Sequence, residues 1–534
     1  MRIVVVGSGA SGVHFALSAL ERGHEVILLD VGNQRGTVPA PDATFSQLKD
    51  TLPDPAGYFL GLEGEGVVYP ASRPSYYGHP PSKHYVFDVP AEFRASAESM
   101  EPMFSFAKGG FAEAWTAGCY AFAPEDLTDF PFDYEALRPH YDTVARRIGV
   151  GAADDDLARF FPRDASYLPP LPPDPHSAWL LARYAGRRAA LNGALGFYLG
   201  RSRVATLSQA HANRPGCTQC GRCLWGCPID SIYRPAVTLT ECERFPAFRY
   251  VPGALVTHFG YDGTGTVREV FIEPLAPGTP DRVTGDLLVL AAGTLATTKI
   301  VLDSLWRRTG RIERLTGLMD NRQIHVPFLT LPMIGQPALT ASYQFHHLAF
   351  GLTTGDPRTY VHGQITTLKA ASVHPVVASL PLDLAGSLRV FRSLRAALGI
   401  ANVNLHDTRR PESWATIRPT GDDRTELVLH YADPPDEASR LTGAVARTGR
   451  ALRRLGCLVP PGMTRVLPKG ASVHYSGTLP MTRSDQGPLS CESSGRLRGM
   501  TNLIIADGAT FPALPAKNLT FTLMANAARL ASAV

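Results

Sequence analysis

The sequence has little charge bias and no long apolar run. Its 52 Lys and Arg residues against 48 Asp and Glu residues leave a net charge of +4, which is too small to predict a nucleic-acid or anionic-membrane partner. No apolar stretch reaches the roughly 18 residues that a membrane-spanning helix needs. The chain starts directly on an apolar strand, with no room for a signal peptide. We therefore expect a soluble, cytoplasmic protein without a membrane span.

Internal repeats are also absent, and the composition is that of a globular protein. Charged residues make up 19% of the chain and hydrophobic residues 44%, which excludes a disordered or coiled-coil protein. The 49 Gly and 44 Pro residues have no fixed period, which excludes collagen. A chain of 534 residues is expected to form about two to four domains.

Cysteine is scarce but unevenly distributed. Four of the eight cysteines fall within eleven positions, namely Cys217, Cys220, Cys223 and Cys227. In a reducing compartment such a cluster favours metal ligation or redox chemistry over disulfides, and its spacing is that of a bacterial ferredoxin loop. An iron–sulfur cluster is therefore a possible cofactor, with Cys227 or a distant cysteine such as Cys119 or Cys242 as fourth ligand. A three-iron cluster, a structural zinc ion and an unmetallated loop are the alternatives.

The N-terminal segment has the pattern of a dinucleotide-binding βαβ unit. An apolar strand over residues 3–6 runs into a G-x-G-x-x-G turn, followed by a helix over 13–22, a second strand over 25–29 and an acidic residue. The predicted cofactor contacts are Gly7, Gly9, Ser11, Gly12 and Asp30. The glycines let the backbone approach a pyrophosphate at the helix N-terminus, and the carboxylate accepts hydrogen bonds from ribose hydroxyls. The motif alone does not separate NAD from FAD.

After the N-terminal unit, the sequence predicts first loops and then a mixture of strands and helices. Residues 33–100 are rich in Pro, Tyr and Ser and are expected to form surface excursions or a lid. A strand pair is predicted over 250–259 and 267–272, and a buried strand over 286–292 precedes a helix over 295–305. Later segments predict strands near 324–331, 426–431 and 502–506 and helices near 134–148, 435–454 and 518–533. A mostly antiparallel sheet backed by helices is thus expected in the middle of the chain.

Several of these segments together resemble one known family. They are Leu28-Leu29-Asp30-Val31-Gly32 after the glycine turn, the pair Gly109-Gly110, the helix at 134–141, the strand Leu290-Ala291-Ala292-Gly293-Thr294, and His474-Tyr475-Ser476-Gly477-Thr478 with Asn518 downstream. In this combination the chain resembles the glucose–methanol–choline (GMC) flavoprotein oxidoreductases over most of its length. The resemblance implies FAD as the cofactor. No histidine follows Gly109-Gly110, where some members attach the flavin covalently, so we expect non-covalent FAD.

The resemblance also implies a fold and its division into domains. The expected fold is an α/β Rossmann-like FAD-binding domain, of the GMC and p-hydroxybenzoate-hydroxylase-like type, with a discontinuous α+β substrate domain built on a mostly antiparallel sheet. Residues 1–322 would form the FAD domain, including a lid at 33–100 and a cysteine loop at 211–236. Residues 323–465 would form the substrate domain, and 466–534 would return to the FAD domain.

The resemblance assigns further site residues. Flavin contacts are expected from Gly109, Gly110, Val256, Ala292, Gly293, Asp507 and Gly508. His474 is expected to be the catalytic base, since its ordinary pKa near 6.5 suits proton transfer, and Asn518 to donate a hydrogen bond to the developing alkoxide. The alternatives are an ordinary loop histidine and a helix N-cap asparagine. Tyr343, Gln344, His346 and His347 could belong to the pocket, but a solvated strand is the preferred interpretation.

The implied function is an FAD-dependent alcohol dehydrogenase or oxidase. It would oxidise a CH–OH group of a sugar-like or amino-sugar substrate, such as the 6′-hydroxyl of the aminoglycoside precursor paromamine, by hydride transfer to flavin N5. Oxygen or an external carrier would accept the electrons. The alternatives are a sterol or hydrophobic-alcohol oxidoreductase, a flavin electron-transfer protein without an alcohol substrate, and a lyase that keeps FAD structurally.

Overall fold

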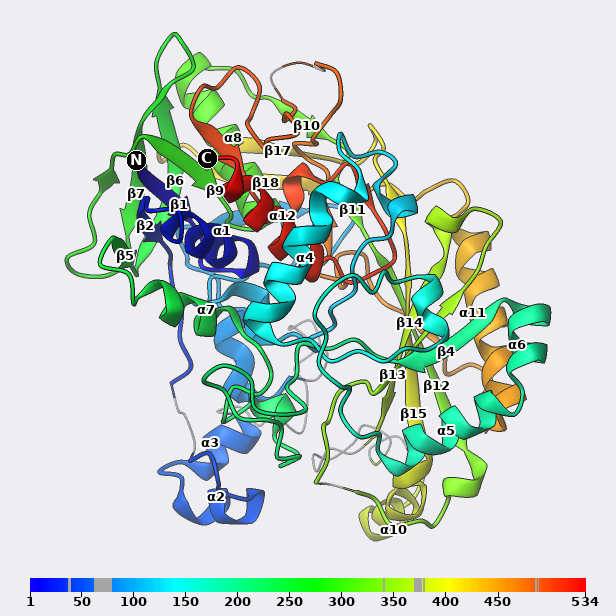
Figure 1. The fold of residues 1–534 in the computed structure, drawn as a ribbon. Coiled ribbons are helices and arrows are strands. Elements are labelled where there is room, and N and C mark those ends of the chain that lie inside the picture. The colour runs from blue at the N-terminus through cyan, green and yellow to red at the C-terminus, as the bar shows by residue number, and fades with distance from the viewer. Residues whose placement is uncertain are drawn as a thin grey trace.

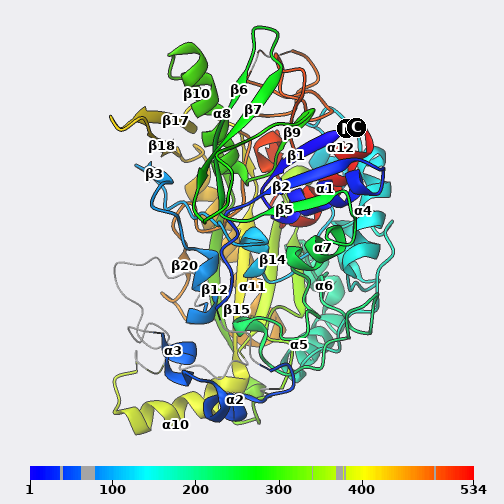
Figure 2. The same cartoon turned by 90° about the vertical axis from the view of Figure 1, so that its left-hand side faces the viewer.

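Two large sheets dominate the architecture. A computed structural model describes residues 1–36, 40–61, 79–339, 341–368, 377, 380–485, 487 and 489–534. A parallel sheet lies near the two termini and a long antiparallel sheet stands beside it (Figures 1 and 2). The termini are neighbours in both views, and the His24 ring contacts the Val534 carbonyl at 3.2 Å. The chain therefore begins and ends in the same part of the molecule.

The parallel sheet follows directly from the apolar strand pattern. Its strands, in spatial order, are β22 (Leu503–Ile505), β9 (Leu287–Leu290), β1 (Arg2–Val6), β2 (Glu25–Leu29) and β5 (Phe248–Val251). Both faces are buried, as continuous apolar runs require. Ile3 and Val5 enter one hydrophobic core, and Val4 and Val6 enter another on the opposite face.

Helices and a small sheet cover the two faces of the parallel sheet. The helices are α1 (Ala10–Leu20), α4 (Tyr134–Ile148), α7 (Pro235–Cys242), α8 (Thr294–Thr309) and α12 (Thr520–Ser532). Helix α1 packs against α7 and α12, and α12 packs against α4, so these four form one group; α8 packs against β6 of the small sheet. The small antiparallel sheet consists of β6 (Ala254–Tyr261), β7 (Val267–Pro274) and β8 (Arg282–Val283).

In the part of the chain that the structure describes, three helices pack on one face of the seven-stranded antiparallel sheet. Its order is β19 (Cys457–Leu458), β12 (Arg322–Thr330), β15 (Leu398–Leu405), β14 (Val361–Thr367), β13 (Leu348–Leu352) and β4 (Phe197–Arg201), with β20 (Arg465–Val466) also paired to β12. The helices on this sheet are α5 (Pro175–Ala185), α6 (Arg188–Leu195) and α11 (Glu437–Leu455). Ile324, Val326 and Phe328 alternate along β12 and enter the core beneath these helices.

Smaller elements complete the chain. A four-stranded sheet contains β10 (Arg314–Thr316), β17 (Trp414–Pro419), β18 (Thr425–His430) and β3 (Arg94–Ala97), and two strand pairs join β11 (Met319–Asp320) to β21 (Tyr475–Ser476) and β16 (Asp407–Thr408) to β23 (Ala513–Leu514). Helices α2 (Phe45–Thr51), α3 (Pro55–Leu60) and α10 (Leu384–Leu394) lie at the end far from the termini (Figure 1). In the described part of the chain, no helix combines the length and hydropathy of a membrane span.

The architecture confirms the expected fold class, a Rossmann-like domain with a mostly antiparallel second sheet. The strand predicted over 250–259 is wrong as one element, because Pro252 and Gly253 interrupt it and Gly253 has a φ of +70°. Strand β4, from the segment predicted to belong to the FAD domain, joins the antiparallel sheet, whereas β17 and β18 do not. The domain boundaries therefore stay a prediction, and residues 37–39 and 62–78 of the predicted lid lie outside the described residues.

Candidate functional site

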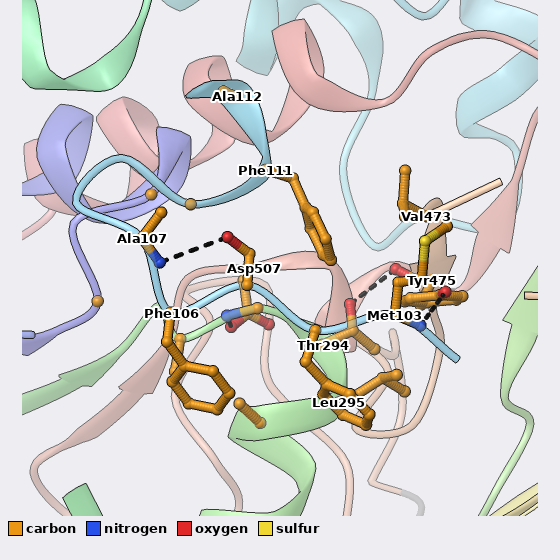
Figure 3. A pocket seen from close by; sticks show the side chains of 18 of the residues that line it. Met103, Phe106, Ala107, Phe111, Ala112, Thr294, Leu295, Val473, Tyr475 and Asp507 are labelled. Carbon is orange, nitrogen blue, oxygen red and sulfur yellow. Dashed lines mark hydrogen bonds between the residues drawn. The ribbon is translucent and has the colours of Figure 1, made fainter. Parts of the chain in front are cut away.

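A cavity of about 880 Å³ lies between the two large sheets. It is lined by the glycine turn after β1, by the loop before residue 116, by the start of α8 and by residues 472–475. Figure 3 shows that Phe111, Leu295 and Val473 come together around it from these separate segments. Every predicted cofactor contact except Gly12 lines this cavity, as do His474 and Asn518. Segments far apart in the sequence thus meet at one site.

The glycine turn has two distinct physical roles. A Cβ on Gly12 would lie 1.9 Å from the Gly7 carbonyl oxygen, and a Cβ on Gly7, whose φ is +97°, would lie 2.6 Å from the Ala291 oxygen. These two glycines let α1, β1 and the end of β9 pack closely. A Cβ on Gly9 would meet no atom within 4 Å, and Gly9 caps α1 without any side-chain cap. The first turn of α1 therefore opens onto free space in the cavity.

Asp30 lies at the carboxyl end of β2 and is held by two hydroxyls. Its Oδ2 accepts hydrogen bonds from the Ser8 hydroxyl and, at 3.1 Å, from the Tyr250 hydroxyl. Burial raises the pKa of Asp30 to about 6, against the lowering effect of these hydrogen bonds. The sequence analysis did not identify Tyr250, which stands on β5 next to β2. The carboxylate is fixed at the cavity wall where a ribose is expected.

The second glycine loop contacts the first. Gly109 and Gly110 have φ values of +106° and +61°, which favour glycine. The Gly109 N–H donates to the Ser8 hydroxyl at 2.9 Å, and a Cβ on Gly110 would lie 3.4 Å from the Gly9 Cα. The two glycine loops therefore form one narrow backbone cradle.

Asp507 joins the ends of two neighbouring parallel strands. Its Oδ2 accepts from the Gly293 N–H at 3.0 Å and the Thr297 hydroxyl at 2.5 Å, and its Oδ1 accepts from the Ala509 N–H at 3.0 Å. Burial raises its pKa to about 6. Ala292, Gly293 and Gly508 are held at the cavity wall by this carboxylate, and Val256 reaches the same cavity from β6.

The imidazole of His474 is oriented by an asparagine. Its Nδ1 lies 3.0 Å from Asn321 Oδ1, while the Asn321 Nδ2 donates to the carbonyls of Leu405 at 2.8 Å and Pro515 at 3.2 Å. Because the Asn321 amide group points its oxygen at the ring, Nδ1 must carry the proton and Nε2 the lone pair. Burial lowers the pKa of His474 to about 4. The ring is therefore neutral at physiological pH, and its Nε2 carries a lone pair that can accept a proton.

The loop that carries His474 is strained and anchored. Val473 has a φ of +53°, a conformation that is unfavourable for a β-branched residue. Asp320 holds this loop by accepting hydrogen bonds from the Ser472 hydroxyl and, at 2.7 Å, from the Gly470 N–H. The Ser472 hydroxyl accepts from the His474 N–H at 2.9 Å. Burial raises the pKa of Asp320 to about 7. The consecutive residues Asp320 and Asn321 thus fix both the backbone and the ring of His474.

Asn518 lies at the same cavity, just before α12. Its Oδ1 accepts a hydrogen bond from Gln364 Nε2 at 2.9 Å, so its Nδ2 is the polar group left for a ligand. The N-cap of α12 is Leu519, and no side chain caps the helix. The alternative interpretation of Asn518 as a helix cap is therefore wrong.

The structure corrects the interpretation of residues 343–347. A solvated strand was preferred, yet Tyr343, Gln344, His346 and His347 are all buried, and no strand forms there. Gln344 and His346 line the cavity, and the Tyr343 hydroxyl donates to the Thr116 carbonyl at 3.2 Å. The alternation of polar residues did not indicate a solvated strand here, because the protein encloses this segment on both sides.

The cysteine loop gives the iron–sulfur prediction no support. In the described part of the chain, which includes all four cysteines, no group of three or more His, Cys, Asp or Glu side chains is placed to hold a metal ion. Cys220 is exposed, whereas Cys223 is buried with its Sγ accepting the Gln344 N–H at 3.4 Å. The donor set does not fit a cluster, and we derive no step from one.

Metal analysis checks this conclusion directly. We expect iron and acid-labile sulfide contents close to zero in anaerobically purified protein, and flavin reduction that is unchanged after treatment with a chelator. Replacing Cys220, the exposed thiol, by serine should likewise leave flavin reduction unchanged. Stoichiometric iron and sulfide that are lost in the Cys220→Ser protein would contradict the structure.

The fold and the cavity together define a class of protein. A parallel βαβ core with a glycine cradle, a buried carboxylate (Asp30) at the end of the second strand and a second sheet closing the cavity is the arrangement of a dinucleotide-dependent oxidoreductase. Residues 411–527 match the family described as GMC oxidoreductase. This match and the GMC-type relatives support a GMC-type, FAD-dependent oxidoreductase that acts on a CH–OH donor. FAD is accordingly the cofactor that the cradle suits.

Individual relatives are distant. The chain is 25% identical to C-glycoside 3-oxidase of Arthrobacter globiformis over 294 residues, 53% of this chain and 52% of that protein, so this match spans about half the relative's length. It is 22% identical to paromamine 6′-oxidase of Streptomyces fradiae, covering all of this chain and 91% of that one. The structure of pyridoxine 4-oxidase from Mesorbium loti superposes with a TM-score of 0.61 at 16% identity, covering 100% and 98% of the two chains.

Proposed function

We propose that this protein oxidises a CH–OH group of a small-molecule alcohol, with FAD as hydride acceptor and His474 as the base. The observation that carries the proposal is the contact between His474 Nδ1 and Asn321 Oδ1, which leaves an unprotonated Nε2 on a ring that lines the cavity. An electron-transfer protein without an alcohol substrate needs no oriented base. The alternatives without a base therefore explain the site less well.

The cavity walls would hold FAD without a covalent link. The residues proposed to contact it are Gly7, Gly9, Ser11, Asp30, Gly109, Gly110, Val256, Ala292, Gly293, Asp507 and Gly508. Gly12 serves the close packing of α1 on β1 instead. The backbone N–H groups at the start of α1 suit the pyrophosphate, and Asp30 suits the ribose hydroxyls. Bound FAD supplies an acceptor for the hydride that leaves the substrate carbon.

His474 and Asn518 would act on the substrate oxygen. The alcohol O–H transfers its proton to Nε2 of His474, and the C–H hydrogen leaves as a hydride, so that a carbonyl forms. The Nδ2 of Asn518 donates a hydrogen bond to the oxygen as negative charge develops on it. Gln364 holds the Asn518 amide group in the required orientation. The proposed roles are those of base and of oxygen stabiliser.

The substrate class is a sugar-like or amino-sugar alcohol. Two relatives support this part of the proposal, because one is a C-glycoside 3-oxidase and the other a paromamine 6′-oxidase. Oxygen or an external carrier would reoxidise the flavin. The test is anaerobic mixing of the holoprotein with sugars, amino sugars and sterols, with flavin bleaching as readout. Failure of every alcohol to bleach the flavin would contradict the proposed function.

The pH dependence of flavin reduction follows from the lowered pKa of His474. Because the neutral ring is the base and its pKa is about 4, the rate constant should be flat from about pH 9 to about pH 5 and fall only below that. In Asn321→Asp a carboxylate would face Nδ1 and favour the imidazolium, raising the pKa by about 1–3 units. The fall should then move to higher pH. Stopped-flow reduction by one alcohol across this range measures both profiles.

A matched variant shows whether the shift of the pH profile is specific to Asn321 or follows from any change of an amide to a carboxylate. Gln336 carries an exposed amide group remote from the cavity lining, and Gln336→Glu should keep the wild-type profile. A wild-type profile centred near the ordinary histidine pKa, or an Asn321→Asp profile identical to wild type, would show that Asn321 does not control the base.

A further inference from the structure

The antiparallel sheet presents a polar face to the cavity. We call the following residues, which alternate along β12, β14 and β15 and all line the cavity, the amide face: Gln323, His325, Gln364, Thr366, Asn402 and Asn404. Strand register places Asn404 opposite Gln323, and Asn402 between His325 and Gln364. The intervening residues, such as Ile324 and Val403, enter the apolar core on the other face. The amide face is thus a continuous patch rather than scattered polar residues.

Two oxygens of the amide face have no hydrogen-bond donor among the residues that the structure describes. The Oδ1 atoms of Asn402 and Asn404 are buried and accept no hydrogen bond from the part of the chain that the structure describes. Asn404 is only 1% exposed. The hydroxyl of Thr367, at the end of β14 and also on the cavity wall, has no partner among the described residues either. Buried polar atoms in native proteins are almost always paired, so these atoms call for a ligand that donates hydrogen bonds.

The amide face carries no negative charge. No Asp or Glu lines the cavity from the described residues of the antiparallel sheet. One cation lies beside this face: Arg465 pairs with His325 across β20 and β12, and burial together with this arginine lowers the pKa of His325 to about 4. The carboxylates that line the cavity come from other elements, namely Asp30, Glu92, Glu273, Asp281, Asp303, Asp422, Asp423 and Asp507. Asp30 and Asp507 already accept hydrogen bonds from the protein. An ammonium group bound at the amide face would therefore find no counter-charge on the described residues of this sheet, which is unfavourable for a buried cation.

We propose that the amide face binds the hydroxyl groups of a neutral polyhydroxylated substrate, a sugar or glycoside without an amino group at the bound ring. Sugar hydroxyls donate to the Asn402 and Asn404 oxygens and accept from the remaining amide N–H groups. A sterol would leave these oxygens unpaired against apolar surface. The inference rests on the proposed alcohol oxidation and narrows its substrate class. Gln364 belongs both to this face and to the support of Asn518, so substrate binding and the reacting oxygen are connected.

The first experiment compares four probes, from three chemical classes, on the FAD-loaded protein. D-glucose and methyl β-D-glucopyranoside represent neutral sugars, glucosamine an amino sugar, and cholesterol in detergent a sterol. We expect kcat/KM for anaerobic flavin reduction to be at least about 10-fold higher for a neutral sugar than for either other class. A factor of about 10 is the usual effect of losing one polar contact between site and substrate. Preferred reduction by glucosamine or cholesterol would overturn the inference and leave the proposed alcohol oxidation intact. If no probe reduces the flavin, the proposed function itself fails.

The second experiment changes the amide face. Asn404→Ala should raise KM for the neutral sugar about 10- to 100-fold, whereas Tm of the substrate-free protein should not fall, because the lost oxygen has no partner in the described chain. Asn404→Asp should shift the preference toward glucosamine, since it supplies a counter-charge. The exposed Gln336→Ala is the matched control and should change neither quantity. A lowered Tm with an unchanged KM in Asn404→Ala would show a purely structural role and overturn the inference.

Discussion

Replacing His474 by alanine is expected to slow flavin reduction by an alcohol about 10²–10⁴-fold, the usual cost of losing a general base. The FAD content should stay at the wild-type level, because the hydrogen bond of the imidazole goes to Asn321, which lies outside the glycine loops. Anaerobic stopped-flow reduction measures the rate, and the absorbance ratio of flavin to protein measures the content. The two readouts separate a catalytic role from a role in binding the cofactor.

The control for this variant is another histidine. His24 lies beside the termini, away from the cavity lining, and His24→Ala should reduce at the wild-type rate. His474→Gln should keep the hydrogen bond to Asn321 better than alanine does but should be as slow, because an amide group does not take up the proton. Near wild-type reduction by His474→Ala would remove histidine from the proposed mechanism, whatever the state of the flavin.

Gly12→Ala is expected to prevent formation of the cofactor cradle. A Cβ at this position would overlap the Gly7 carbonyl oxygen at 1.9 Å, and neither backbone segment can move without separating α1 from β1. We expect mostly insoluble protein, and less than about a tenth of the wild-type FAD content in any soluble fraction. Soluble yield and flavin absorbance of the purified variant measure the effect. Wild-type yield and colour would contradict the packing role of Gly12.

Gly9→Ala should behave differently, although it stands in the same motif. The added Cβ meets nothing within 4 Å in the described structure, so the free energy of unfolding of the apoprotein should change by less than about 0.5 kcal/mol. The methyl group would point into the space proposed for the pyrophosphate, and FAD affinity should fall. Gly193→Ala on α6, where a Cβ also meets nothing, is the matched control and should bind FAD normally. A stable Gly9→Ala protein with normal affinity would show that the cofactor does not approach this turn.

Local sequence patterns predicted the half of the cavity that is proposed to hold the cofactor. The strand at residues 3–6, the glycines of the turn and Asp30 are joined by short-range geometry, so spacing alone indicates how they lie. The segments around Gly109, His474 and Asn518 were found from resemblance, and the structure places all three at the same cavity. Their chemical roles stay proposals, because position shows which groups meet and not what they do.

The tertiary structure decided how the reactive groups are supported. Asn321 and Asp320 stand about 150 positions before His474, and no local pattern connects a loop after β11 with a later histidine. The sequence likewise gave no reason to separate Cys220 from Cys223 in burial. Such contacts depend on the packing of whole elements and are invisible to residue spacing.

By itself the sequence determined that this chain builds a dinucleotide cradle, because a G-x-G-x-x-G turn between a buried strand and a helix has few other stable uses. The tertiary structure alone decided what faces that cradle. Strand register places Asn402 and Asn404 from β15 against Gln364 and Gln323 from two other strands, and a shift of one residue would turn every one of these side chains into the apolar core.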